Sequence, residues 1–119
     1  MMNGIKYLLK IEEFFMLLGS LILYNFLGYS WFVFSLFLFL PDIGMIAYWF
    51  GSKIGAIIYN FFHSRIIAVL FLIAGILLFY IPLQILGIAF FCHICLDRML
   101  GYGLKYQDSF WNTHLGRIK

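Results

Sequence analysis

Four side chains that could bind a metal ion lie within otherwise apolar stretches of this sequence: Asp42, His63, His93 and Asp97. His93 and Asp97 are four residues apart, so in a helix they share one face and can approach a common atom. Two imidazole nitrogens and two carboxylate oxygens suit a divalent transition metal such as zinc. Such a metal could lower the pKa of a bound water to about 7 and so produce a nucleophile. The pattern therefore indicates a metal-dependent catalytic site.

Several further residues could serve the same site. Tyr59 and Asn60 lie about one helical turn before His63 and could orient its imidazole through hydrogen bonds. Glu13, next to Glu12, is a candidate general base. Arg98 could bind an anionic headgroup. A simpler alternative stays open for the carboxylates, because each aspartate could pair with an arginine and only hold the helices together.

The composition places these residues in a membrane. Of the 119 residues, 65% are hydrophobic, 22% aromatic and 11% charged, whereas an ordinary soluble domain has about 45–50% apolar and about 25% charged residues. A soluble fold of this length could not hide so much apolar surface. The chain is therefore expected to be an integral membrane protein with the lipid bilayer as its partner. Its net charge of +3 is too small and too dispersed to favour nucleic-acid binding.

Four segments are long and apolar enough to cross a bilayer, which needs roughly 20 residues per helix. They are residues 7–27, 31–50, 54–80 and 82–101. The third is too long for one straight span, so we expect it to tilt or break at His63-Ser64-Arg65. Short connections make sequential helices antiparallel neighbours. The sequence predicts a single all-α domain, a bundle of four transmembrane helices.

Basic residues predict how this bundle is oriented. Threading four spans puts the terminal lysines and arginines and the connection at Lys53 on one side, while the other two connections carry no charge. The positive-inside rule makes that side cytoplasmic. We therefore expect both termini in the cytoplasm, a short cytoplasmic tail over residues 102–119, and a cell-membrane location.

The polar residues also fall at similar depths. Asp42, His63 and His93 each lie near the middle of a predicted span, and Asp97 lies one turn beyond His93. Ionisable residues at such depth are costly and usually functional. Pro41 interrupts the helical hydrogen bonds beside Asp42, and irregular backbone of this kind is tolerated where protein or a water-filled cavity covers it. We therefore expect these side chains to face one another.

The same residues carry a resemblance to a known family. The elements are Pro41-Asp42, Tyr59-Asn60-x-x-His63, His93-x-x-x-Asp97-Arg98 continuing as DRxxGYGLKY, and Thr113-His114-Leu115-Gly116. Together they resemble the domain-of-unknown-function 4260 family of small bacterial membrane proteins. The resemblance implies a compact helical membrane protein, here in a bacterial inner membrane, and brings no assigned activity. It also suggests that His114 belongs with the site.

Four functions remain open at this point. The first is an intramembrane metal-dependent hydrolase that acts on a lipid-type substrate through a site opening to the cytoplasmic side. The second is a transporter or a subunit that relays protons or cations, although the outer halves of the spans are nearly free of polar residues. The third is haem or quinone binding through His63 and His93. The fourth is a structural membrane protein.

Overall fold

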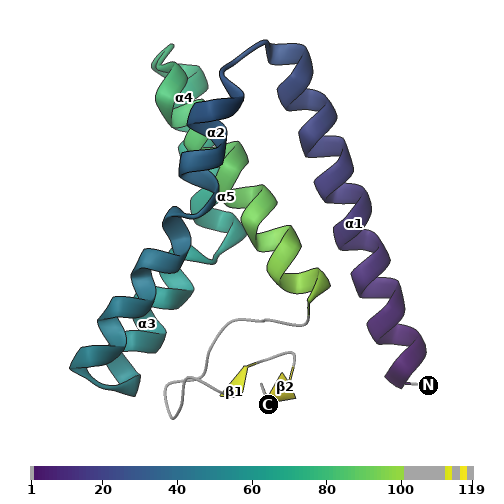
Figure 1. The fold of residues 1–119 in the computed structure, drawn as a ribbon, viewed down its shortest axis with the longest axis vertical. Helices are drawn as coiled ribbons and strands as arrows, with labels where there is room; N and C mark the ends of the chain where they lie inside the picture. Colours follow the sequence, from purple (N-terminus) through teal and green to yellow (C-terminus); the bar gives the residue numbers. More distant parts are fainter. Residues whose placement is uncertain (1, 101–111, 114–115, 118–119) are drawn as a thin grey trace.

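The computed structural model describes residues 2–100, 112–113 and 116–117, and the side chains of 4–43 and 46–100. The chain is helical, as the all-α prediction required, apart from two strands of two residues each that pair antiparallel. The elements are α1 (Met2–Leu27), α2 (Trp31–Leu38), the 3₁₀ helix η1 (Leu40–Phe50), α3 (Ser52–Phe62), α4 (Arg65–Leu77), α5 (Ile81–Met99), β1 (Asn112–Thr113) and β2 (Gly116–Arg117) (Figure 1).

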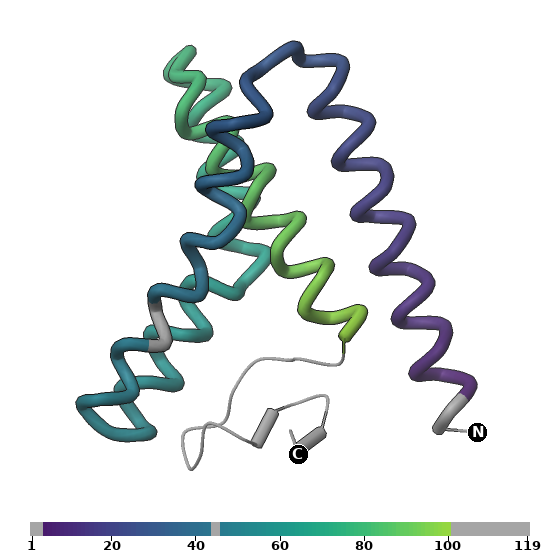
Figure 2. Tube along the Cα trace, in the orientation of Figure 1, coloured from purple at the N-terminus to yellow at the C-terminus, as the bar shows by residue number. Residues whose placement is uncertain are grey.

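The chain path runs up and down through these helices. Figure 2 shows α1 rising, α2 and η1 descending, α3 and α4 rising again, and α5 descending. Gly28 lies in the turn between α1 and α2, and Gly51 lies between η1 and α3. Both glycines have positive φ angles, 73° and 111°, which residues with a Cβ adopt at a cost. Because the chain reverses direction at each connection, consecutive segments are antiparallel, as the short connections predicted.

The segment over residues 31–50 changes helix type at a proline. Pro41 has no N–H to donate and clashes with the preceding turn, so it is tolerated only where a helix begins. Here it lies at the start of η1, and the Asp42 N–H donates to the Phe39 carbonyl (3.3 Å) in a 3₁₀ pattern. The α-helical partner of that N–H would be the Leu38 carbonyl, which the change releases.

The segment over residues 54–80 breaks where the polar residues lie, which confirms that prediction. α3 ends at Phe62, and the Ser64 side chain caps α4 by accepting a hydrogen bond from the Ile66 N–H at 3.2 Å. The two helices meet at an angle of 43°. His63 is therefore the residue that follows α3, and Arg65 opens α4.

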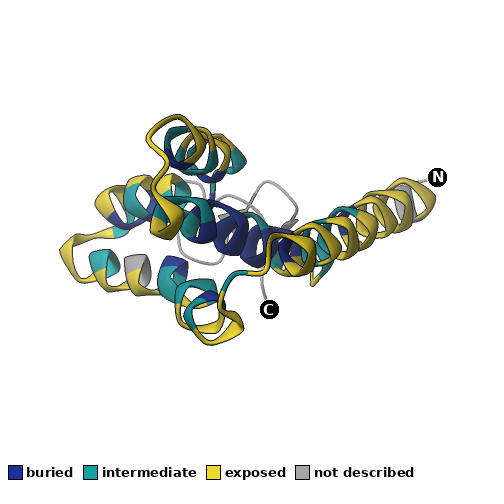
Figure 3. Ribbon diagram, turned by 90° about the horizontal axis from the view of Figure 1, so that it is seen from above, coloured by how far each residue is buried: buried dark blue, intermediate teal, exposed yellow. Residues whose placement is uncertain are grey.

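Helices α4 and α5 approach closely because two glycines lie at their contact. A Cβ on Gly87 would lie 2.6 Å from the Leu72 nitrogen and 2.7 Å from the Ala68 oxygen, and one on Gly75 would lie 2.6 Å from the Gln84 nitrogen. Small residues allow such approach between helices in membranes. α5 is consequently the central helix, and of the described elements it carries the largest share of buried residues (Figure 3).

Helix α1 is attached to the others mainly through its C-terminal half. There Tyr24 is fully buried and packs against Phe34 of α2 and Ile88 of α5. Residues 4–12 are exposed, and Figure 3 shows this half extending away from the other helices. Glu13 is buried at the point of departure and forms an ion pair with Arg65 of α4.

The described helices are consistent with a membrane location. By length and apolar composition, Trp31–Phe50 and Ile81–Met99 could each span a bilayer, and the bent pair of α3 and α4 could form a third span. Many large apolar side chains are exposed, Trp49 and Phe79 almost completely, which is unusual for a surface facing water. The four-span arrangement and the cytoplasmic termini stay predictions.

Candidate metal centre

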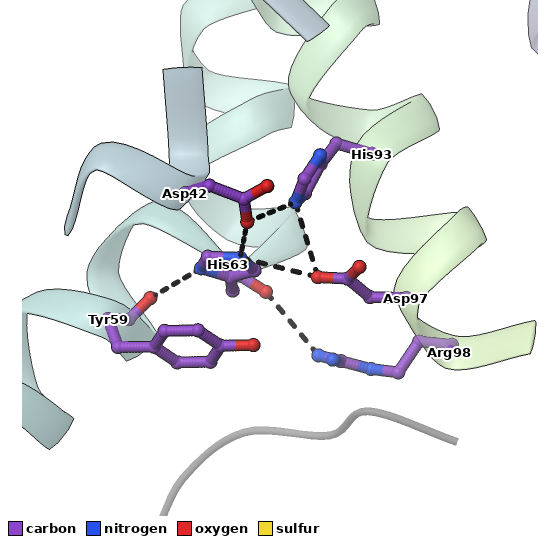
Figure 4. A network of polar contacts seen from close by, with 6 residues as sticks. All are labelled: Asp42, Tyr59, His63, His93, Asp97 and Arg98. Carbon is purple, nitrogen blue, oxygen red and sulfur yellow. Dashed lines mark hydrogen bonds and ion pairs between the residues drawn. The ribbon is translucent and has the colours of Figure 1, made fainter. Parts of the chain in front are cut away.

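The four predicted ligands come together from three parts of the fold. Asp42 comes from η1, His63 follows α3, and His93 and Asp97 lie on the same face of α5. One nitrogen or oxygen from each residue lies within 4.8 Å of the corresponding atom of every other. Figure 4 shows these side chains pointing toward one another. The group could hold a metal ion, as the sequence predicted.

Four distances between ligand atoms of the group are short enough for a common metal ion. His93 Nε2 lies 3.1 Å from Asp42 Oδ1 and 3.2 Å from Asp97 Oδ2. His63 Nε2 lies 3.3 Å from the same Asp97 oxygen and 3.7 Å from the same Asp42 oxygen. A tetrahedron with metal–ligand bonds of about 2.0–2.1 Å has edges of about 3.3–3.4 Å. The four distances are close to that value, and the remaining two pairs of ligand atoms lie within 4.8 Å of each other, so all four atoms could reach one metal ion.

Hydrogen bonding within the group is poor despite these short distances. Both Nε2 atoms are buried, and neither makes a well-directed hydrogen bond with any group in the described part of the chain. Buried polar atoms are normally hydrogen-bonded. The imidazoles and carboxylates thus lie around a shared point, an arrangement that a metal ion could complete.

The surroundings of His63 assign its proton. Its Nδ1 lies 2.9 Å from the Tyr59 carbonyl oxygen, so Nδ1 carries the hydrogen and donates it, and Nε2 presents its lone pair to the group. The Tyr59 ring stacks on the imidazole, with 3.8 Å between the ring centroids and an interplanar angle of 10°. Arg98 Nη2 donates to the His63 carbonyl oxygen at 3.4 Å. Three contacts therefore fix this ligand.

His93 is oriented by the irregular backbone near Pro41. It forms a hydrogen bond with the backbone of Leu38, whose carbonyl is the one that the 3₁₀ turn releases. Since Nε2 faces the carboxylates, Nδ1 is the atom left for this bond. The proline thus contributes in two ways, because it begins the helix that carries Asp42 and supplies an acceptor for His93.

Burial differs among the four side chains. His63 is fully buried, His93 and Asp97 are 7% and 15% exposed, and Asp42 is 45% exposed. Gathering two carboxylates in a largely apolar region is costly unless a positive charge compensates them. The exposed Asp42 marks the side from which the group is accessible.

The other predicted site residues lie in different places. Tyr59 and Arg98 border the group through His63, and Asn60 is half-buried on α3 between Tyr59 and His63. Glu13 is not in the group, since its carboxylate pairs with Arg65. His114 lies outside the described residues.

Two details of this region were not foreseen from the sequence. One is the Glu13–Arg65 pair, for which the signal was two opposite charges inside apolar segments. The other is the bond between His93 and the Leu38 backbone, for which the signal was Pro41. Cys92 and Cys95 are free, buried thiols of α5 that lie outside the group.

Comparisons with known proteins give a single result. A family model described as "Domain of unknown function (DUF4260)" matches residues 6–118, which is nearly the whole chain and includes all four residues of the group. Comparisons with curated proteins and with solved structures found no match. On the strength of the family match, the chain belongs to the DUF4260 family.

Proposed function

We propose that this protein is an intramembrane hydrolase that uses a divalent metal, such as zinc, to cleave a lipid-type substrate. The observation that carries the proposal is the convergence of two histidine nitrogens and two carboxylate oxygens at spacings that one metal ion could bridge. Each element that contributes a ligand also contains the local feature that directs it, namely Pro41, the break after Phe62 and the i,i+4 spacing on α5.

The proposal includes four spans with both termini in the cytoplasm. α1 has the length to cross a bilayer, and its charges, Lys6, Lys10, Glu12 and Glu13, all lie in its N-terminal half. In the up-and-down path, that half lies at the same end as the connection carrying Lys53 (Figure 2). The positive-inside rule then favours a cytoplasmic location for this end.

Hydrolysis needs a position for water beside the four protein ligands. Zinc is usually four-coordinate but can accept a fifth ligand during catalysis. The Asp42 edge is the natural place, because Asp42 is the most exposed ligand and its distance to His63 is the longest of the four. If the four residues held a metal, it would activate a water at this edge, and the water oxygen would form a bond to the acyl carbon or phosphorus of the ester. The ester bond would then break, and the proton from the water would end on the departing alcohol.

A lipid-type substrate follows from what surrounds the accessible side. Phe39, Ile43 and Ile46 are exposed apolar residues that flank Asp42 along the chain. A polar substrate would have to leave water to reach the group past them, whereas a lipid already has its apolar part in the bilayer. The site therefore suits a molecule with an apolar chain next to the bond that is cleaved.

Metal content tests this proposal directly. The protein would be purified in mild detergent without a histidine tag, and bound metals would be quantified by elemental mass spectrometry. We expect about one zinc, manganese or iron per chain, lost in His93→Ala and retained in the control Cys92→Ala. Cys92 is a neighbouring buried residue of α5 outside the group. An absence of metal from the wild-type protein, with both variants equally stable, would refute the proposal.

A proton or cation relay is a second candidate. Each imidazole lies within 3.7 Å of both carboxylates, so the group could also share protons in the absence of a metal. The two candidates differ in their response to chelators. A metal-dependent hydrolase loses ester cleavage when ethylenediaminetetraacetate strips the metal, whereas a relay keeps its proton movement in reconstituted vesicles.

A further inference from the structure

We infer that the η1–α3 hairpin, residues 40–63, is a hinged unit that closes onto α5 when a metal ion binds. The inference rests on the proposed function and adds a regulation of the same site, which is then complete only in the closed position. It starts from how the four ligands are divided. Asp42 and His63 lie near the two ends of the hairpin, whereas His93 and Asp97 lie on α5.

The two helices of the hairpin form a tightly packed pair. The ring of Tyr48 in η1 lies so close to Gly55 in α3 that no room is left there for a Cβ. The Gly51 N–H donates to the Tyr48 carbonyl at 3.1 Å, and the Gly55 N–H donates to the Gly51 carbonyl at 2.9 Å, so the turn between the helices is also hydrogen-bonded. These contacts allow the hairpin to move as one body.

Both connections of the hairpin to the rest of the chain interrupt a helix. The first is the change from α2 to η1 at Pro41, and the second is the break at His63, where α3 and α4 meet at 43°. Hinges in proteins are a few residues at the ends of elements that absorb changes in φ and ψ. Asp42 Oδ1 and His63 Nε2 lie 3.7 Å apart, so the two interruptions are adjacent in space and can act as one hinge.

Apolar packing between the hairpin and the buried clusters of the other helices is limited to the ends of the hairpin. In the described part of the chain, these clusters are formed by α1, α2, α4 and α5. The hairpin residues that pack against them are Leu40 and Phe62, and the Phe62 ring is edge-on to Phe90 of α5 with 6.3 Å between centroids. Beyond this point α3 diverges from α5 (Figure 1). Regions with few buried apolar contacts open at a low cost in free energy.

The ligand group crosses the boundary between hairpin and α5. His93 Nε2 lies 3.1 Å from Asp42 Oδ1, and His63 Nε2 lies 3.3 Å from Asp97 Oδ2, so each of these distances joins the two units. The hydrogen bond from Arg98 to the His63 carbonyl joins them as well.

The charges of this group link its closure to a metal. The carboxylates of Asp42 and Asp97 carry like charges and repel each other, which favours separation of the two units. A divalent ion attracts both carboxylates and reaches all four ligands only in the closed position. A ligand that binds one of two conformations more tightly shifts the equilibrium toward it. Opening of the hairpin would then admit the metal and the substrate, and closure would assemble the site.

Distances between spin labels on the protein in detergent test the inference. One pair, Lys53→Cys with Leu100→Cys, joins an exposed position near the hairpin turn to the end of α5, and the control pair, Leu77→Cys with Leu100→Cys, joins α4 to α5. Both pairs are made in a Cys92→Ala/Cys95→Ala background, because the native thiols are free.

The expected shift follows from the length of α3. This helix has 11 residues and is about 16 Å long, so a rotation of about 10° at its hinge moves its far end by about 3 Å. We expect Zn²⁺, compared with chelator, to narrow the distance distribution between labels at 53 and 100 and to shorten its mean by more than about 2 Å. The control pair should not change.

Zinc content, measured in the same samples by elemental mass spectrometry, separates the outcomes. If zinc binds and the distribution between labels at 53 and 100 does not change, or the control pair changes equally, the inference is wrong while the metal site stands. If no zinc binds, the proposed function is refuted and the inference with it. His93→Ala should bind no zinc and show no shift, and a shift in this variant would also overturn the inference.

Zinc affinity gives a second readout. Phe62→Ala removes the contact with Phe90 that favours the closed position, so it should broaden the metal-free distribution and weaken zinc binding several-fold, because the apparent affinity falls with the fraction of closed protein. Saturating zinc should restore the wild-type distance. Phe61→Ala, at the exposed neighbouring position, should change neither property. Unchanged zinc affinity in Phe62→Ala would overturn the link between closure and binding.

Discussion

Replacing Glu13 with leucine removes one partner of the ion pair between α1 and α4. The carboxylate of Glu13 is buried, and its partner Arg65 also lies over the ring of Phe91, with 5.7 Å from the guanidinium carbon to the ring centroid. Breaking a buried ion pair by removing one partner typically costs about 3–5 kcal/mol. The Arg65 side chain is 34% exposed, so we expect the lower end of this range, about 3 kcal/mol.

Replacing both partners should have a much smaller effect. In Glu13→Leu/Arg65→Leu no charge remains without a partner, and two leucines can pack against Phe91 and the surrounding lipid. Such exchanges of a buried pair for apolar residues are often neutral or stabilising. We therefore expect the double variant to recover most of the stability that the single variant loses.

The free energy of unfolding can be measured by titrating the protein in mixed micelles with sodium dodecyl sulfate and following its circular dichroism. Glu12→Leu, at an exposed position next to Glu13, is the matched control and should change stability by less than about 0.5 kcal/mol. If Glu13→Leu is as stable as the wild-type protein, or if the double variant is as unstable as the single one, the pair does not hold α1 to the bundle.

Three further predictions concern the site and its support. Asp97→Asn should weaken metal affinity more than Asp42→Asn does, because Asp97 is more buried and lies close to both imidazoles. Competition with a chromophoric chelator measures both affinities. The reverse order would contradict this geometry. Pro41→Ala should weaken metal affinity without loss of thermal stability. The α-helix can then continue, and the Leu38 carbonyl accepts a helical hydrogen bond instead of the one from His93. Unchanged affinity would show that this carbonyl does not position His93. Gly87→Ala should destabilise the bundle by about 1–3 kcal/mol in the same detergent titration, because its Cβ would lie 2.6 Å from a backbone nitrogen of α4; a neutral result would mean that α4 and α5 pack less tightly.

Local features of the structure could be predicted well from the sequence. The helix change at Pro41 and the break at His63-Ser64-Arg65 follow from chemistry within a few residues, namely a missing N–H and a capping serine. The prediction of a membrane location follows from composition, which does not depend on how the helices pack, and the described helices are consistent with it. The four metal-binding candidates were also identifiable from the sequence, because ionisable residues are rare in apolar segments and usually have a function there.

Contacts between distant helices were decided only by the tertiary structure. Glu13 was a candidate base for the site by its depth, yet the rotation of α1 turns its carboxylate to Arg65 instead. Arg65 and Arg98 were both possible partners for the aspartates, and the structure brings Arg65 to Glu13 and Arg98 to the His63 carbonyl. Such pairings depend on how each helix is rotated about its axis and on the angle at which helices cross. Both are set by packing over whole helix faces, such as the contact at Gly75 and Gly87, and the spacing of residues along one segment does not contain that information.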